Sequence, residues 1–207
     1  MQNRRKALVL TALIGVVWAG SIGAGLRYML YYEHTAGSSG AVPSAWPANS
    51  TLSRSADRET LLVFAHPRCP CTRATMSELA EVMAHTQGKL NATVVFFAPP
   101  EAGHDWYDTD LHRKAAAIPG VTVVADHDAI EAKRFGVETS GHTMLFAVDG
   151  RLLFQGGITG SRGHEGDNAG ENAIVAIVNG HSAPQDKTLV FGCSLTEHAQ
   201  FASTSQP

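Results

Sequence analysis

The sequence predicts an α/β domain, with a mixed sheet flanked by helices, behind one N-terminal transmembrane helix. Apolar runs of strand length alternate with segments of helical spacing in the order β-α-β-α-β-α-β-β-α, which is typical of such a sheet. An uncharged run of 20 residues, 7–26, is long enough to cross a bilayer as a helix. We therefore expect one membrane helix and one folded domain at residues 59–195.

The composition excludes some classes of function. The net charge of −3 gives no basic excess, so we expect no nucleic-acid partner. Of three cysteines, two lie close together in one motif and one is remote. This usage argues against a scaffold stapled by disulfides and favours a reactive pair.

The N-terminus carries its positive charge before the apolar run. Residues 1–6 contain Arg4, Arg5 and Lys6 and are expected to stay in the cytoplasm, followed by a signal anchor at 7–30. Tyrosines at its end suit the membrane interface. A cleaved signal peptide is the alternative, but the run is long and offers only a weak cleavage site. We expect a single-pass inner-membrane protein whose domain faces the periplasm, an oxidising compartment.

Two flanking segments are predicted to lie outside the domain. Residues 31–58 are rich in Gly, Ser, Ala and Pro, which is typical of a linker, although Trp46-Pro47 could dock on the domain. Residues 196–207 resemble a flexible tail.

The chain is organised around residues 61–83, LLVFAHPRCPCTRATMSELAEVM. A buried strand over 61–65 ends in a short turn, and Cys69 and Cys71 follow at the start of an amphipathic helix. Free backbone N–H groups and the helix dipole stabilise a thiolate there. Four neighbours are expected to support the thiols, by charge, by starting the helix or by ending the strand: His66, Arg68, Pro70 and Arg73.

The remaining elements follow in order. Strands are expected at 92–97, 121–124, 143–148 and 151–154, the last two joined by an Asp149-Gly150 hairpin. Helices are expected from Thr109 or Asp110 to Ile118, over 129–135 and over 168–178. Residues 189–191 could add a small strand.

The motif resembles the opening of a thioredoxin-like domain. The segments HPRCPCTRATMSELA, GGITGSRGHEGDNAG and FGCSL together resemble the bacterial RedB-type proteins, a membrane-attached, thioredoxin-like group, over about Trp46 to Leu195. The resemblance implies a thioredoxin-like fold and leaves the reaction to be argued from the residues.

His142 stands where thioredoxin-like enzymes usually carry a cis-proline. Aligned on the hairpin, the expected Ile-Pro-Thr is Gly141-His142-Thr143 here. The Sco-type copper chaperones are similar in having a cysteine pair and a histidine at this place, but they put three residues between the cysteines and this chain puts one. Cys69, Cys71 and His142 are thus a candidate copper or zinc ligand set. A surface or turn histidine is the alternative.

The leading hypothesis is a thiol–disulfide oxidoreductase that needs no cofactor. Cys69 would attack and Cys71 would resolve the mixed disulfide with a periplasmic or membrane protein. The small Cys-Pro-Cys ring predicts a strained, oxidising disulfide. A copper-binding chaperone or sensor is the alternative. Two inert structural cysteines, or a peroxidase, are weaker alternatives, and the peroxiredoxin pattern Pro-x-x-x-Thr-x-x-Cys is missing.

Two further features stay open. Cys193 is either a small buried hydrophobe or a third redox thiol that pairs with Cys69 or Cys71. The glycine-dense segment 156–170 could be read as an anion-binding loop, but it lacks the P-loop lysine. We expect it beside the active site, where His164, Glu165 and Asp167 could bind a metal or position a substrate.

Overall fold

The computed structural model describes residues 2–106 and 108–196, and nearly all of the predicted tail lies outside them. The chain divides into two compact units, residues 1–35 and 36–207. The first unit is built on one long helix, α1 (Gln2–Glu33), and none of the residues of this helix is buried. By length and composition this helix can cross a membrane. The predicted long apolar helix at the N-terminus is confirmed.

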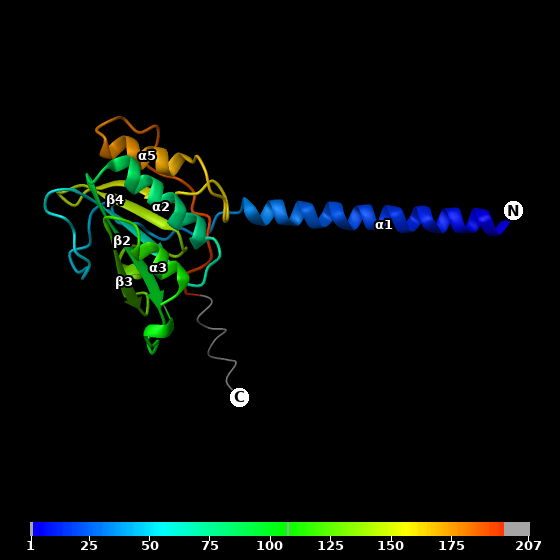
Figure 1. The fold of residues 1–207 in the computed structure, drawn as a ribbon, viewed down its shortest axis with the longest axis horizontal. Coiled ribbons are helices and arrows are strands. Elements are labelled where there is room, and N and C mark those ends of the chain that lie inside the picture. Colours follow the sequence, from blue (N-terminus) through cyan, green and yellow to red (C-terminus); the bar gives the residue numbers. More distant parts are fainter. Residues whose placement is uncertain (1, 107, 197–207) are drawn as a thin grey trace. The chain divides into compact units, whose positions relative to one another are not determined.

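The second unit contains a five-stranded mixed sheet with the strand order β3-β2-β1-β4-β5 (Figure 1). The strands are β1 (Glu59–Ala65), β2 (Leu90–Ala98), β3 (Val121–His127), β4 (His142–Phe146) and β5 (Leu152–Gly156). β1, β2 and β3 run parallel, whereas β4 pairs antiparallel with both β1 and β5. The predicted mixed sheet is confirmed.

Helices cover both faces of this sheet. They are α2 (Thr72–Thr86), the 3₁₀ turn η1 (His104–Trp106), α3 (Asp110–Ala116), α4 (Ile130–Arg134) and α5 (Ala169–Val178). α2, α3 and α5 share one apolar cluster on one face, in front of the strands in Figure 1, and α4 contributes to a second cluster on the other face. The strand order, the parallel β1–α2–β2 unit and the closing β4–β5–α5 make the fold thioredoxin-like.

Alternation along β1 explains the two clusters. Leu61 and Val63 face α2 and α5, and Leu62 and Phe64 face α4. Since successive side chains of a strand point to opposite faces, a buried strand needs apolar residues at nearly every position. The unbroken apolar run 61–65 meets this requirement.

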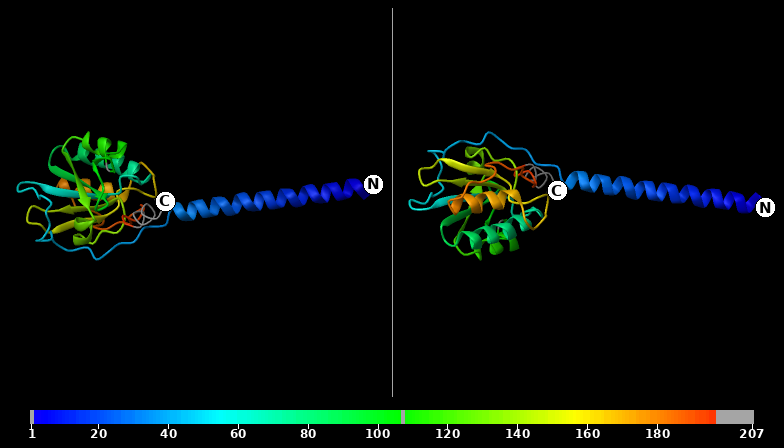
Figure 2. Two further views of the ribbon diagram at one scale, coloured as in Figure 1. Left: turned by 90° about the horizontal axis from the view of Figure 1, so that it is seen from below. Right: turned by 90° about the horizontal axis from the view of Figure 1, so that it is seen from above.

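Residues 36–58 pack on the domain. The Trp46 ring meets the Phe135 and Phe146 rings edge-on at 5.2 and 5.1 Å between centroids. The Trp46 N–H donates to the Gly150 carbonyl at 2.8 Å. Figure 2 shows this blue-to-cyan segment along the face opposite α2 and α5. Trp46 thus docks on the domain, as Trp46-Pro47 suggested, and Val42 and Leu52 of the same segment also pack against the second apolar cluster.

The last described segment runs along the domain without regular structure. The short strand expected at 189–191 is not formed. Instead, the Leu189 carbonyl accepts from the Gly157 N–H, and the Val190 carbonyl accepts from Gly37. The Leu195 N–H donates to the Glu138 carbonyl at 2.9 Å. These long-range bonds hold the segment that carries Cys193 against the domain.

A three-cysteine cluster as candidate functional site

Cys69 and Cys71 lie in the turn between β1 and α2. The Cys69 N–H donates to the His66 carbonyl, and the Cys69 carbonyl accepts from the Thr72 N–H, both at 3.1 Å. Cys71 directly precedes α2 and already has helical backbone angles, φ −66° and ψ −26°. Pro70, between the two cysteines, is exposed. The tight turn therefore presents both thiols at the N-terminus of the helix.

The third cysteine, Cys193, joins them from the far end of the chain. Its Sγ atom lies 2.7 Å from the Sγ of Cys69, although 124 positions separate the two residues. The Sγ atoms of all three cysteines lie within 4.8 Å of one another. Cys69 is 2 % exposed, whereas Cys71 and Cys193 are half-buried. Cys69 is therefore the most buried residue of the three.

The three thiols shift one another's pKa values in opposite directions. Hydrogen bonds from the Cys193 and then the Cys71 thiol lower the pKa of Cys69 and outweigh the opposing effect of burial. The same bond to Cys69 is the main reason why the pKa of Cys193 is raised. For Cys71, the Cys193 thiol lowers the pKa, but the thiol and charge of Cys69 and burial together raise it. These directions favour loss of the first proton of the cluster at Cys69, with Cys71 and Cys193 as hydrogen-bond donors to it.

The sequence did not identify two residues that shape this cluster. The Ser140 hydroxyl accepts from the His66 N–H at 2.9 Å and lies 3.0 Å from the Thr72 hydroxyl, so it links β1, α2 and the segment before β4. The charge of Arg162 lowers the pKa of Cys71, and its guanidinium donates to the Gly192 carbonyl. Neither residue stands in a motif, and only Arg162 lies in a segment singled out for its glycines.

The four predicted supporting residues have various partners. His66 is buried; its Nδ1 accepts from the Arg68 N–H at 3.2 Å, and its ring stacks on Phe97 at 5.7 Å. The Arg68 guanidinium lies 3.9 Å from the centre of the Trp106 ring. Arg73 forms an ion pair with Asp110 at 2.5 Å. These contacts fix the turn and the start of α2, and Arg162 is the arginine whose charge acts on a cluster thiol.

His142 lies at the start of β4, opposite Phe64 in the sheet register. It is 1 % exposed. Burial, and then the charge of Lys187, lowers its pKa to about 4, against a smaller opposing effect of Gln155. Its imidazole is not a member of the group of ligand atoms formed by the three cysteines. The structure thus brings Cys193, rather than His142, to the two motif cysteines.

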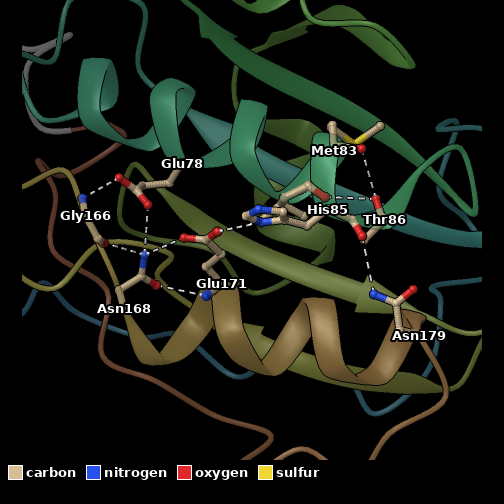
Figure 3. A network of polar contacts seen from close by, with 9 residues as sticks. Glu78, Met83, His85, Thr86, Gly166, Asn168, Glu171 and Asn179 are labelled. Carbon is tan, nitrogen blue, oxygen red and sulfur yellow. Dashed lines mark hydrogen bonds and ion pairs between the residues drawn. The ribbon is translucent and has the colours of Figure 1, made fainter.

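The glycine-dense segment is tied to α2 by a network of carboxyl and amide groups (Figure 3). Glu78 of α2 accepts from the Gly166 N–H at 2.7 Å and from the Asn168 amide at 3.1 Å. The Asn168 side chain also caps α5 by accepting from the Glu171 N–H at 2.8 Å. Burial, followed by the Glu78 carboxyl, raises the pKa of Glu171 to about 7, and His85 opposes this shift.

The three polar residues proposed in that segment, His164, Glu165 and Asp167, are exposed. Glu165 accepts from the Ser77 hydroxyl at 2.8 Å. Within the part of the chain that the structure describes, none of the three belongs to a cluster of metal-ligand type. The segment instead supplies Arg162 to the cysteine cluster.

Comparisons with known proteins concern the fold. No family model matches the chain, and no curated protein sequence matches it. A hypothetical protein of Sinorhizobium meliloti 1021 is 17 % identical, with 76 % of this chain and 96 % of that one covered and a TM-score of 0.60. An uncharacterized conserved protein of Geobacillus kaustophilus is 17 % identical, with coverage of 78 % and 95 % and a TM-score of 0.61.

A third solved structure is that of a thioredoxin-like protein in the oxidized form. It is 18 % identical, covers 71 % of this chain and 93 % of its own, and has a TM-score of 0.42. By its own strand order, and with two cysteines directly after β1, this chain has a thioredoxin-like α/β fold.

Proposed function

We propose that the protein is a membrane-anchored thiol–disulfide oxidoreductase. The observation that carries the proposal is the gathering of three thiols where β1 meets α2, one of which, Cys69, is buried and has a lowered pKa. A cluster sulfur forms a mixed disulfide with a partner protein, and a second cluster thiol resolves it. The partner disulfide gains two electrons and becomes two thiols, and the cluster loses two electrons and becomes one disulfide. The reverse sequence oxidises a partner dithiol.

The location is part of the proposal. The positive charge of Arg4, Arg5 and Lys6 before α1 supports a cytoplasmic N-terminus, with the domain on the periplasmic side of the inner membrane. An oxidising compartment provides partner thiols and disulfides. The RedB-type resemblance agrees with this arrangement. A membrane-impermeant maleimide added to spheroplasts should label the reduced cysteines. If labelling needs lysis of the spheroplasts, the topology is wrong.

The test of the activity uses Cys69→Ser. The full-length chain, purified in a mild detergent, is assayed for dithiol-driven reduction of insulin disulfides and for oxidation of a reduced model protein. Cys69→Ser should lose both reactions by at least about 100-fold, because the thiolate is the nucleophile and leaving group of exchange. Ser53→Ala, an exposed substitution, is the control. Equal rates in Cys69→Ser and Ser53→Ala would exclude the proposal.

A soft-metal function is the second candidate, supported by the same three sulfur atoms. Sulfur ligands favour Cu(I), and three thiols within 4.8 Å of one another suit one such ion. The sequence suggested His142 as the third ligand, whereas the structure places Cys193 at the cluster. Reduced protein should be titrated with Cu(I) against a competing chelator, with His142→Ala and Cys193→Ala compared. Weaker binding in Cys193→Ala alone would identify a three-thiolate site, and weaker binding in His142→Ala alone the Sco-like set.

A further inference from the structure

We propose that Cys193, and not Cys71, closes the redox disulfide with Cys69, and that Cys193 is the sulfur attacked by the partner. This inference rests on the proposed thiol–disulfide exchange and identifies the residues that perform it. It differs from the sequence-based expectation, in which Cys71 resolves a mixed disulfide on Cys69.

The first support is proximity. The Sγ atoms of Cys69 and Cys193 are 2.7 Å apart, which is only about 0.7 Å longer than a covalent S–S bond. A bond between Cys69 and Cys71 would close a ring with one residue between the cysteines, far from the preferred disulfide geometry. The long-range pair is therefore the less strained choice.

The second support is the way in which the segment around Cys193 is held. The Cys193 carbonyl accepts from the Ser140 N–H at 2.8 Å, and Leu195 donates to the Glu138 carbonyl. Gly192 lies so close to the Ser140 carbonyl that a Cβ atom would meet its oxygen at 1.8 Å. Arg162 also donates to the Gly192 carbonyl. Contacts on both sides of Cys193 thus fix its thiol at Cys69.

The third support is access. A polar hollow of about 460 Å³ is lined by the neighbours of Cys193, Gly192 and Ser194, together with Glu138 and Arg162. Cys69 is 2 % exposed, whereas Cys193 is half-buried. Although Cys193 itself does not line this hollow, both of its chain neighbours do, so a partner that approaches past Gly192 and Ser194 comes to the Cys193 end of the disulfide.

The resulting reaction has a defined order. A partner thiolate attacks Sγ of Cys193, forms a mixed disulfide and releases Cys69 as a thiolate. The second partner thiolate then attacks the partner's own sulfur in the mixed disulfide, which leaves the partner oxidised and Cys193 reduced. The partner gives up two thiol protons: one goes to solvent and the other to Cys193. While Cys193 is part of the mixed disulfide it has no proton to donate, so the Cys71 thiol is the donor that stabilises Cys69 as the leaving thiolate.

Cys71 stays a thiol throughout this cycle. The Cys193 thiol lowers the pKa of Cys71, but the hydrogen bond to Cys69, burial and the Cys69 charge together raise it. The Cys71 thiol stabilises the departing Cys69 thiolate by a hydrogen bond. Cys71 is therefore a positioning residue. Its removal should raise the pKa of Cys69 without removing the disulfide.

Disulfide mapping tests the pairing without any assay of turnover. Full-length protein in detergent is oxidised in a glutathione buffer, its free thiols are blocked with N-ethylmaleimide, and its peptides are identified by mass spectrometry. The wild type should show Cys69 joined to Cys193 and a blocked Cys71. Cys71→Ser should keep this disulfide, and Cys193→Ser should lower its disulfide yield at least about ten-fold at the same redox poise. A Cys69–Cys71 disulfide as the main wild-type product would overturn the inference.

The attacked sulfur is tested in oxidised Cys71→Ser. Reduced glutathione is added, the reaction is stopped with N-ethylmaleimide, and the adducts are mapped. Glutathione on Cys193 with a blocked Cys69 is expected, and the opposite assignment would contradict the inference. If the wild type forms no internal disulfide and exchanges with no thiol, the proposed function itself fails. That result can be told apart from a failure of the inferred pairing, in which a Cys69–Cys71 disulfide would form instead.

Discussion

The α-carbon of Gly192 lies against the carbonyl of Ser140, so close that a Cβ atom would stand 1.8 Å from the oxygen and 2.9 Å from the carbon. This contact joins the C-terminal segment to the residues before β4. It also sets the position of Cys193, the next residue. Glycine is required here by space, since the opposing atoms belong to the backbone and cannot rotate away.

Gly192→Ala should therefore displace Cys193 from Cys69. We expect a loss of about 1–3 kcal/mol in unfolding free energy of the reduced protein, as for other overpacked sites, and a lower yield of the Cys69–Cys193 disulfide. Denaturant unfolding and disulfide mapping measure the two effects. Gly103→Ala is the control, because a Cβ at Gly103 meets no atom within 4 Å. Similar behaviour of the two variants would show that the contact is not constraining.

Removal of the Cys193 thiol should raise the pKa of Cys69. The Cys193 thiol is the larger of the two hydrogen-bond donors that stabilise the Cys69 thiolate, and Cys71 is the smaller. Titration of thiolate ultraviolet absorbance in the reduced protein should show one thiolate well below pH 7 in the wild type. Cys193→Ala should move this transition toward the ordinary range of a thiol, further than Cys71→Ala does. The opposite ranking would contradict the assigned hydrogen bonds.

The Glu78–Glu171 pair should make stability depend on pH. The pKa of Glu171 is raised from 4.5 to about 7 in the folded protein, so folding binds a proton between these values. The stabilisation that this bound proton gives the folded protein is complete below about pH 4.5 and is lost as pH rises through 7. Denaturant unfolding at several pH values from 5 to 8 should show a loss on the order of 1–2 kcal/mol.

Glu171→Gln should flatten this pH dependence, because it removes the titrating group. Glu81→Gln, on an exposed position of α2, should leave it as in the wild type. A slope unchanged by Glu171→Gln would assign the titration to another group.

Trp46 should stabilise the domain although it precedes β1. Its ring packs edge-on against Phe135 and Phe146 over the α4 face. Trp46→Ala should lower the unfolding free energy by roughly 2 kcal/mol, from lost apolar burial and aromatic contacts. Leu189→Ala, at a position 63 % exposed, is the control. If both variants unfold alike, residues 36–58 act as a tether alone.

The sequence by itself determined the order and type of the main elements. Strand and helix periodicities are local, so the runs at Leu61–Ala65 and at Met76–Met83 could be read directly, and the strand-to-helix junction placed Cys69 and Cys71 at a helix N-terminus. The uncharged run over residues 7–26 could likewise be identified as a membrane-length helix without any tertiary information. The boundaries shifted by one to three residues, because the pairing of neighbouring strands sets where each strand ends.

The tertiary structure decided which side chains meet the two thiols. Cys193 reaches Cys69 through backbone bonds to Glu138 and Ser140, and no periodicity in the sequence reports such pairings. The approach of Arg162 also depends on how the glycine-dense segment folds. His142 aligns with the expected proline, yet its ring is absent from the cysteine group, because a position in an alignment does not state what a side chain contacts. The docking of residues 36–58 depends likewise on an apolar face that exists only once the sheet has formed.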